Sequence, residues 1–398
     1  MNETIARIQA ALREADVDGW LFYDFRHSDP IAYRILKLDE RRLGTRRWFY
    51  FIPADGEPVK IVHIIESEQL DALPGAKLIY LPWSQLHEHL QRVLRGRRRI
   101  AMQYSPNNDI PYISRVDAGT IELLRRFGVE IVSSADLVQH FEAVWSPEQL
   151  QTHLEAEPKM RRIVDETFAE IARCVASGRP TDEYRLQQFI LQCFEREGLV
   201  TDHPPIVAAD AHSANPHYSP TPDSAWPIRE GTFVLIDLWA KLRDVPRAVY
   251  VDITWTGFVG DVVPDRYARV FHVVREARDR AIAFVREAVR TRRPIHGWEV
   301  DDVAREVIRR AGLGDFFIHR TGHSIGEDVH GNGANIDNLE TRDNRRILPH
   351  TCFSIEPGVY LEGEFGVRSE VDVYVGDEDV IVTARPIQTE IVPILTLL

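Results

Sequence analysis

The chain has 398 residues, and its 61 Asp and Glu outnumber its 48 Lys and Arg, which gives a formal net charge of −13. Hydrophobic residues make up 44% and charged residues 27%, so we exclude a disordered or fibrous protein and expect one large or two ordinary globular domains. The acid excess argues against non-specific nucleic-acid binding, which requires cationic surfaces. Three cysteines cannot form a disulfide framework, residues 1–20 are typical of a helix rather than a signal peptide, and no apolar run is long enough to span a membrane. We therefore expect a cytoplasmic protein that binds neither nucleic acid nor membrane.

Helical and strand patterns alternate through the first part of the chain, which favours an α/β layer. The turn at Asp55-Gly56 joins two strand-like runs and predicts a hairpin. We expect helices over 5–15 and 86–94 and one ending near 127, and strands over 19–23, 48–53, 58–62, 77–80, 99–102 and 129–132.

A domain boundary is expected near Trp145, because Ser146 is a good N-cap and Pro147 suits the first position of a long helix. The sequence therefore predicts two domains, residues 1–145 and 146–398. Residues 203–226 are rich in Pro, His, Ala and Ser without a period, and they are expected to form a long loop. The remaining expected elements are helices 147–176, 183–197, 264–290 and 299–311 and strands 233–238 and 248–256, followed by further strands. The order helix, helix, strand, strand occurs twice, which suggests two halves related by pseudo-symmetry.

Four carboxylates of the second part interrupt patterns that are otherwise suited to burial. They are Asp237, Asp252, Glu356 and Glu370. A single such residue is more often paired with arginine or used as a cap, because an unpaired buried carboxylate is costly. Four of them in one domain would repel one another strongly without a shared cation. A divalent metal ion is the simplest solution.

An imidazole group accompanies these carboxylates in Thr321-Gly322-His323-Ser324. One histidine with four carboxylates is an oxygen-rich set that suits Mn, Co, Fe or Zn rather than a thiolate zinc site. Because carboxylates can bridge, five ligands can hold two metal ions about 3.5–4 Å apart, a spacing used for hydrolysis.

These segments resemble the motifs of the pita-bread metallopeptidases, which include methionine aminopeptidase, prolidase and Xaa-Pro aminopeptidase. The resemblance covers Trp145 to the C-terminus, and the preceding residues are similar to the creatinase/prolidase N-terminal domain. It implies an α/β N-terminal domain and an α+β pita-bread catalytic domain with pseudo-two-fold symmetry. It also implies two divalent ions, with Mn first and Co, Zn or Fe as alternatives. By resemblance, Asp237 is a terminal ligand, Asp252 and Glu370 are bridging ligands, and His323 and Glu356 bind one ion.

Further side chains match accessory positions of that family. His217 resembles its first active-site histidine, and His330 the histidine that polarises the scissile carbonyl. His319 matches a substrate-pocket histidine, and Arg368 an arginine linked to the metal-site carboxylates. The resemblance implies cleavage of the Xaa-Pro bond in short peptides or dipeptides, with Glu356 carrying a proton to the leaving nitrogen. It also leads us to expect a homodimer.

The chain departs from the family pattern in three places. The interval between Asp237 and Asp252 is longer than usual, and its extra tip is expected at residues 241–246. Trp255 stands where the family has an arginine, and Gly331 follows His330 in place of an acidic residue. We expect these changes to alter the substrate pocket and to leave the ligands untouched.

Three other functions compete with Xaa-Pro hydrolysis. A hydrolase of the same fold could act on a small non-peptide amide, as ectoine hydrolase does. A metal-free creatinase-like enzyme is disfavoured because such relatives lose the ligands that this chain keeps. A non-catalytic pita-bread binding module is disfavoured by the five intact ligands and by the absence of acidic tails or basic extensions.

Overall fold

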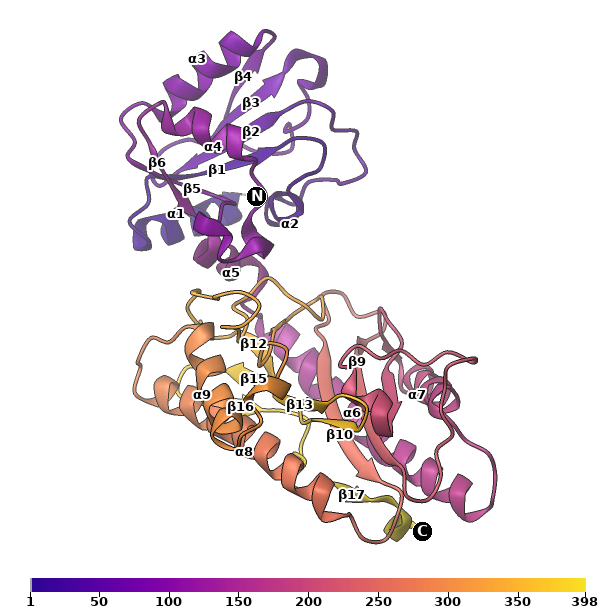
Figure 1. Cartoon of the computed structure of the whole chain (residues 1–398). Helices are drawn as coiled ribbons and strands as arrows, with labels where there is room; N and C mark the ends of the chain where they lie inside the picture. Colours follow the sequence, from indigo (N-terminus) through magenta and orange to yellow (C-terminus); the bar gives the residue numbers. More distant parts are fainter. Residues whose placement is uncertain (1) are drawn as a thin grey trace. The chain divides into compact units, whose positions relative to one another are not determined.

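The structure, a computed structural model, describes residues 2–398. The chain divides into two compact units, Met1–Glu142 and Ala143–Leu398 (Figure 1). Each unit has hydrophobic clusters of its own. Among residues 2–398, no helix combines the length and the apolar character that crossing a membrane requires.

The first unit is a six-stranded mixed sheet with the order β4-β3-β2-β1-β5-β6. Strands β1, β5 and β6 are parallel, and β2 joins β1 and β3 in antiparallel pairs. The predicted hairpin is present as β2 and β3. The strands are β1 Gly19–Asp24, β2 Trp48–Pro53, β3 Val59–His63, β4 Ala76–Tyr80, β5 Arg99–Met102 and β6 Glu130–Ser133.

Helices cover both faces of this sheet, so the central strand is buried throughout. Trp20 and Phe22 of β1 point to the face that α1, α2 and α5 cover, while Leu21 and Tyr23 point to the face under α3 and α4. The helices are α1 Asn2–Glu14, α2 Pro30–Leu36, α3 Trp83–Leu94, α4 Ala118–Arg125 and α5 Ala135–Glu142.

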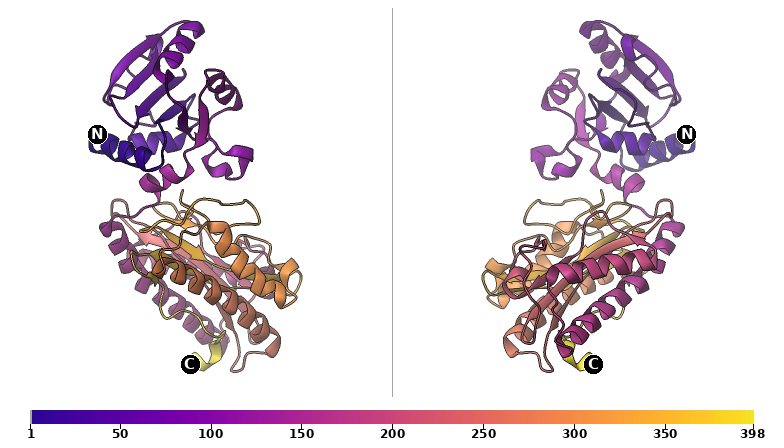
Figure 2. Two further views of the ribbon diagram at one scale, coloured as in Figure 1. Left: turned by 90° about the vertical axis from the view of Figure 1, so that its left-hand side faces the viewer. Right: turned by 90° about the vertical axis from the view of Figure 1, so that its right-hand side faces the viewer.

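The second unit places four long helices against several sheets whose strands are mostly antiparallel. Helix α6 packs on β9 and β10, and α8 packs on β12, β13 and β14; Figures 1 and 2 show both helices running along the outside of the strands. One sheet has the order β17-β10-β9-β7 with β8 also on β9, a second has the order β11-β12-β15-β16, and β13 pairs with β14. The helices are α6 Pro147–Ala176, α7 Glu183–Glu197, α8 Asp265–Arg290 and α9 Gly297–Arg310. The strands are β7 Leu199–Val200, β8 Ile206–Ala209, β9 Phe233–Leu242, β10 Val251–Phe258, β11 Ser324–Ile325, β12 Cys352–Ile355, β13 Gly358–Leu361, β14 Phe365–Arg368, β15 Val371–Val375, β16 Val380–Val382 and β17 Val392–Pro393.

The helix boundaries follow local signals in the sequence. Ser146 caps α6 in a capping box with Gln149, and Pro147 occupies the first turn, as predicted. Asp182 caps α7, and Gly198 ends it in the left-handed conformation at φ 69°. The order helix, helix, antiparallel strand pair occurs first as α6, α7, β9 and β10, and again as α8, α9, β12 and β15.

Three expectations about this unit are wrong. Residues 206–209 lie in the segment expected to be a continuous loop, yet they form β8, whose short apolar run has no period because β9 and a buried core enclose it. The hairpin tip begins later than residue 241, because β9 continues to Leu242 to pair with Leu199 of β7. The second strand begins at Val251 rather than at residue 248.

Candidate metal centre

Strands β9 and β10 bring two of the expected ligands onto one face. Asp237 lies opposite Thr254 and Asp252 lies opposite Trp239 in the antiparallel register. Cross-strand partners and alternate residues share a face, so all four side chains point the same way. The exposed fractions of Asp237 and Asp252 are 8% and 4%.

His323 reaches the same place from the segment that leads into β11. Its neighbour Gly322 is required there, because a Cβ on Gly322 would lie 1.9 Å from the carbonyl oxygen of Ser354. The ring Nδ1 lies 3.3 Å from the Ser324 carbonyl oxygen, which can only accept, so Nδ1 carries the proton. The lone pair of Nε2 is therefore left to face the carboxylates, as a metal ligand requires.

Glu356 and Glu370 lie together because β12 and β15 end side by side. Ile355 pairs with Val371, so Glu356 directly follows one strand and Glu370 directly precedes the other. The Ser354 hydroxyl lies 3.1 Å from Glu356 Oε1, and the Thr254 hydroxyl lies 2.7 Å from Glu370 Oε2.

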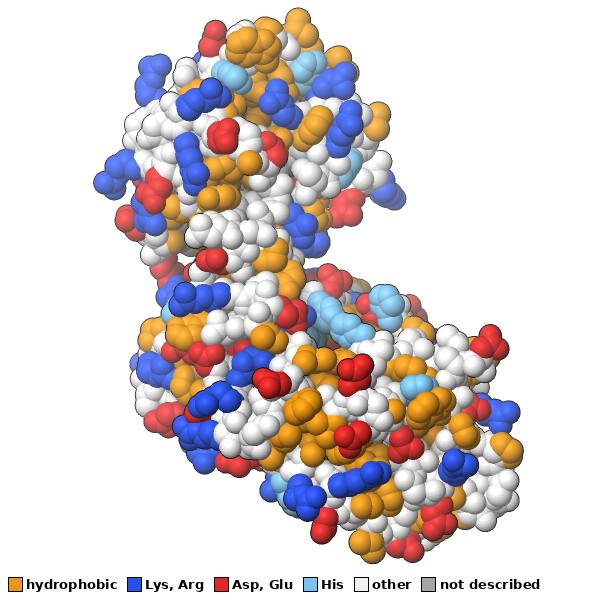
Figure 3. Space-filling view, in the orientation of Figure 1, with side chains coloured by type: hydrophobic (Ala, Val, Ile, Leu, Met, Phe, Trp, Pro, Cys, Tyr) orange, Lys and Arg blue, Asp and Glu red, His pale blue; other side chains and the backbone are white. Residues whose placement is uncertain are grey.

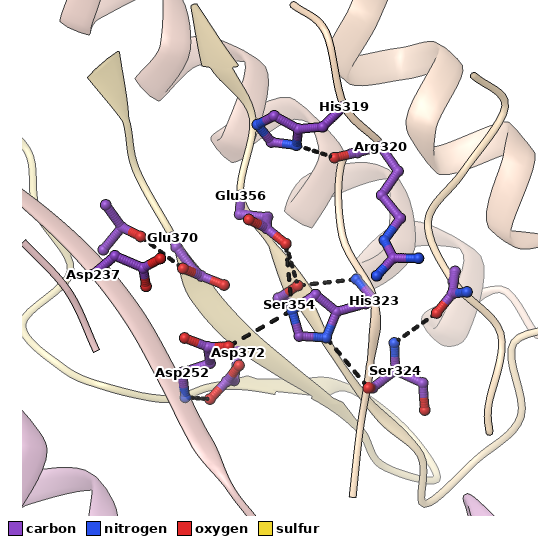
Figure 4. Close-up of polar contacts among 12 residues, drawn as sticks. Asp237, Asp252, His319, Arg320, His323, Ser324, Ser354, Glu356, Glu370 and Asp372 are labelled. Carbon is purple, nitrogen blue, oxygen red and sulfur yellow. Dashed lines mark hydrogen bonds and ion pairs between the residues drawn. The ribbon is translucent and has the colours of Figure 1, made fainter. Parts of the chain in front are cut away.

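These side chains converge into one buried cluster from β9, from β10 and from positions directly beside β11, β12 and β15 (Figure 4). Ligand atoms of Asp252, His323 and Glu370 all lie within 4.8 Å of one another, as a shared cation would require. His323 Nε2 is 3.6 Å from Asp252 Oδ2 and 3.4 Å from Glu356 Oε1. Asp237 borders the cluster through Arg368, whose Nη2 donates to its Oδ2.

The donor atoms of this cluster fit a cation. Asp237 Oδ1, Asp252 Oδ1 and Glu370 Oε1 are buried and have no hydrogen-bond partner among the described residues. Burial raises the pKa of Asp237 and Asp252, the latter well above its usual range, with the neighbouring carboxylates adding to the effect on Asp252. Burial likewise raises the pKa of Glu356 to about 7 and that of Glu370 well above its usual range. Buried carboxylates that lie close together are costly to ionise unless a cation is bound. The three unpartnered oxygens indicate where such a cation would bind.

Two hydroxyl groups fix the side chain of Arg368, which in turn contacts Asp237. Its Nε lies 3.0 Å from the Thr254 hydroxyl, and its Nη1 lies 2.9 Å from the Tyr360 hydroxyl. The side chain is buried, and its contact with Asp237 leaves the other Asp237 oxygen unpartnered. The arginine thus fixes the direction in which Asp237 presents its second oxygen.

A cavity of about 750 Å³ opens beside the cluster, within the usual range for small-ligand sites. His217, His319 and His330 line it together with the five expected ligands. The ring of His330 stands edge-on to that of His323, with 4.4 Å between the ring centres. Burial lowers the pKa of His330 to about 4. On the face drawn in Figure 3, histidine side chains gather along one edge of the second unit.

His319 lines the cavity with both ring nitrogens already engaged. Nδ1 donates to the Arg320 carbonyl oxygen at 2.7 Å, and Nε2 lies 2.8 Å from the Tyr360 hydroxyl. Burial lowers its pKa to about 3, so the ring is neutral. His319 can therefore offer a substrate an apolar ring surface.

Sequence reasoning missed three side chains of this centre. Thr254 and Ser354 hold the carboxyl groups of Glu370 and Glu356, and Asp372 accepts the backbone N–H of Asp252 at 2.9 Å. Asp372 repeats the signal that revealed the others, an acidic residue inside a buried strand pattern. Its spacing of two from Glu370 also predicts the same face.

The expected effect of Trp255 on the pocket is wrong. Trp255 does not line the cavity, since its side chain points to the opposite face of β10 and joins the hydrophobic cluster around α6. The guanidinium of Arg161 on α6 lies 3.7 Å from the centre of its ring, so an arginine contacts this position from another element. Gly331 does not line the cavity either.

Several curated proteins are similar in sequence to this chain. A probable dipeptidase PepE from Mycobacterium bovis is 28% identical over 276 residues, which cover 69% of this chain and 67% of that protein. An Xaa-Pro dipeptidase from Lactobacillus helveticus is 36% identical over 166 residues, or 42% of this chain and 40% of that protein. A putative Xaa-Pro aminopeptidase from Mycoplasma pneumoniae is 29% identical over 231 residues, or 58% of this chain and 60% of that protein.

Solved structures share the fold over nearly the whole length. Dipeptidase PepE from Mycobacterium ulcerans superposes with a TM-score of 0.67 at 22% identity, covering 98% of this chain and 97% of that chain. A prolidase from Thermococcus sibiricus gives a TM-score of 0.62 at 22% identity with the same coverage. These matches confirm the expected fold class, an α/β N-terminal domain followed by a pita-bread catalytic domain.

Residues 158–377 match metallopeptidase family M24. The matched segment contains the cluster of Asp237, Asp252, His323, Glu356 and Glu370 and most of the cavity wall. A family of this kind implies a divalent metal ion and a peptide substrate. The chain belongs to metallopeptidase family M24.

Proposed function

We propose that this protein is a dinuclear metallopeptidase that hydrolyses the Xaa-Pro bond in dipeptides or at the N-terminus of short peptides. The observation that carries the proposal is the set of buried, unpartnered oxygens of Asp237, Asp252 and Glu370, whose side chains line the cavity together with His323. Family membership and the names of the similar Xaa-Pro dipeptidases and aminopeptidase support the reaction and its substrate class.

The five residues Asp237, Asp252, His323, Glu356 and Glu370 would hold two divalent ions. Four carboxylates and one imidazole favour Mn, with Co, Zn or Fe as alternatives, because oxygen-rich sets suit such ions. When bound, the ions supply Lewis acidity toward a peptide carbonyl and make water acidic enough to react near neutral pH.

The remaining residues bind the substrate and move protons. His330 stands beside the ligand His323 and is placed to donate a hydrogen bond to the scissile carbonyl oxygen. Glu356 is placed to carry a proton from the attacking water to the leaving proline nitrogen, and His217 lines the same cavity from the segment between β8 and β9. Arg368 orients Asp237, and His319 offers its ring to the substrate.

The cavity wall supports a preference for an apolar, cyclic side chain. Ile206, Tyr218, Trp239, Ile318 and Val329 contribute apolar surface that a proline ring could cover. Proline at the scissile bond has no N–H, so it needs no hydrogen-bond acceptor from the wall.

Three further features belong to the proposal. We keep the domain limits 1–145 and 146–398, the first as a creatinase/prolidase-like domain. A homodimer follows from the resemblance to dimeric relatives. A cytoplasmic location is supported by three free, buried cysteines among the described residues.

The test combines metal analysis with peptide hydrolysis. Purified protein should contain or take up two equivalents of divalent ion and, with Mn²⁺, Co²⁺ or Zn²⁺, should cleave Ala-Pro or Ala-Pro-Ala far faster than Ala-Ala or Ala-Ala-Ala. Failure to bind metal in stoichiometric amounts would overturn the proposal. Metal binding without cleavage of any of these peptides would favour a small non-peptide amide as substrate.

A further inference from the structure

A buried carboxyl group at the start of α7 contacts the segment between β8 and β9, residues 210–226. Glu183 is the first residue of that helix and is 0% exposed. It follows the cap Asp182, where the unpaired backbone N–H groups of the first turn favour an acidic side chain. Glu183 is not one of the five expected ligands, and it does not line the cavity. Its burial therefore has to be explained by the groups that it contacts.

Two backbone N–H groups from the two ends of the segment meet on this side chain. Glu183 Oε1 accepts the N–H of Ala209 at 2.6 Å, and Oε2 accepts the N–H of Trp226 at 2.7 Å. The backbone N–H of Glu183 in turn donates to the Trp226 carbonyl oxygen at 3.2 Å. Because a backbone N–H can only donate, both oxygens of Glu183 must act as acceptors. An amide in the same place has one acceptor oxygen and could satisfy only one of the two N–H groups.

Two side chains of the segment contact the same carboxyl group. The Tyr218 hydroxyl lies 2.7 Å from Glu183 Oε2, and His212 Nδ1 lies 2.9 Å from Oε1 and 3.0 Å from Oε2. The His212 ring also packs on the rings of Tyr218 and Trp226, with 4.2 and 4.0 Å between the ring centres. A single side chain thus contacts both ends of the segment and two positions between them.

The middle of this segment forms one wall of the cavity. The lining residues from it are Asn215, Pro216, His217, Tyr218 and Ser219. Backbone hydrogen bonds here are local, since the Tyr218 N–H donates to the Asn215 carbonyl oxygen and the Asn215 N–H to that of His212, both at 3.1 Å. Such bonds shape a turn but do not fix it against the rest of the chain. Glu183 connects this wall to a helix that lies outside the cavity.

We propose that Glu183 is a positioning residue, which acts through residues 210–226 to place His217 and Tyr218 against the substrate. The inference rests on the proposed function, because it assumes that a peptide binds in this cavity. It adds a residue that is neither an expected ligand nor part of the cavity wall. A wall that contacts substrate and transition state alike contributes mainly to KM. Loss of Glu183 should therefore change KM more than kcat.

Glu183→Gln keeps the size of the side chain but places an amide NH₂ against one of the two backbone N–H groups. With Ala-Pro and saturating Mn²⁺, KM should rise at least about tenfold, since small displacements of positioning groups have effects of this size. Amide hydrogen exchange should become faster across residues 210–226 and stay unchanged in β10. Calorimetric titration with Mn²⁺ should match the wild type, because no expected ligand is altered. A loss of stability alone would reduce the active fraction, and so lower kcat while KM stayed the same.

Glu195→Gln is the matched control, because it removes an exposed carboxylate from the last turn of the same helix. Its KM, kcat and amide exchange should equal those of the wild type. If circular dichroism shows that Glu183→Gln does not fold, Tyr218→Phe removes one contact with Glu183, keeps the ring, and should raise KM at least about threefold. If the wild type cleaves Ala-Pro, an unchanged KM in the folded variant would overturn the inference alone. A wild type that binds Mn²⁺ and cleaves no peptide would overturn the proposed function and the inference with it.

Discussion

Both units of this protein bury carboxylates with an unpartnered oxygen, yet they differ in what can compensate the cost of burying these groups. In the first unit, Asp29 caps α2 through Oδ1, while its Oδ2 is buried without a partner among the described residues. Burial, with the nearby Asp24 charge adding to it, raises the pKa of Asp29 to about 7. A single proton therefore removes the problem at small cost.

The second unit cannot use the same remedy. Asp237, Asp252 and Glu370 each leave an oxygen unpartnered in one cluster, and ligand atoms of Asp252, Glu370 and His323 lie within 4.8 Å of one another. Several protons would be needed there, and the cluster would lose its charge. A shared cation satisfies all the oxygens together. One orphaned carboxylate therefore indicates a perturbed pKa, whereas a convergent set with an imidazole indicates a metal centre.

The largest expected effect comes from removing one charge of the convergent set. Asp252→Asn keeps the size of the side chain but removes the charge of a proposed ligand whose Oδ2 lies 3.6 Å from His323 Nε2. We expect kcat/KM on the best Xaa-Pro peptide to fall by at least about 10³-fold, roughly 4 kcal/mol of transition-state stabilisation. Circular dichroism should show an unchanged fold.

Asp29→Asn is the control for this experiment, because it also removes a buried carboxylate with an unpartnered oxygen. It lies in the first unit, so peptide hydrolysis should remain within about twofold of wild type. Activity of Asp252→Asn within tenfold of wild type would contradict the difference between the two kinds of buried carboxylate.

The second prediction concerns the proton on Asp29. Its pKa is raised from 3.8 to about 7 in the folded protein, so between these values the folded state holds a proton that the unfolded state releases. Stability therefore falls as pH rises through this window and levels off above it. Asp29→Asn lacks this loss, and its stability relative to wild type should rise by up to about 4 kcal/mol from pH 4 to pH 8.

Urea unfolding followed by hydrogen exchange of first-unit amides measures that difference. Asparagine caps α2 as well as aspartate does, so the cap itself is retained. Asp55→Asn, at a side chain 80% exposed, should follow the wild type at every pH. A constant difference between Asp29→Asn and wild type across the window would contradict the proton on Asp29.

The sequence predicts the frame of the centre because its signals are local. Ser146, Pro147 and Asp182 determine helix starts that the structure contains, and Asp237 and Asp252 are conspicuous because each stands inside an apolar strand. Cross-strand register then follows from antiparallel pairing, although the strand ends differ from those expected. Asp372 carried the same signal, and it needed only the period of two from Glu370 to be recognised.

Other features depend on contacts that are distant in sequence. Strand β8 is too short and too evenly apolar to show a period, and only its pairing with β9 defines it. Trp255 lies on the face of β10 opposite Asp252, as its odd spacing from that residue implies, but the arginine that contacts it, Arg161, comes from α6. The hydrogen bond that occupies Nε2 of His319 depends on Tyr360 of β13, which is distant in sequence.

The smallest expected effect tests whether the cation acts on one unit only. Removing metal with a chelator should lower the free energy of unfolding of the second unit by about 2.7 kcal/mol, relative to protein with the ion at one hundred times its Kd. Amides that exchange only when that unit opens should then exchange roughly 10²-fold faster. The amides of β10 and β15, where Asp252 donates to Asp372, should show it, while those of β1 and β2 should not change. Asp252→Asn should lose most of the difference. The ion is not expected to bind at Asp29 of the first unit, because a proton already satisfies that carboxyl group. Equal acceleration of amide exchange in both units would therefore contradict a metal site confined to the second unit.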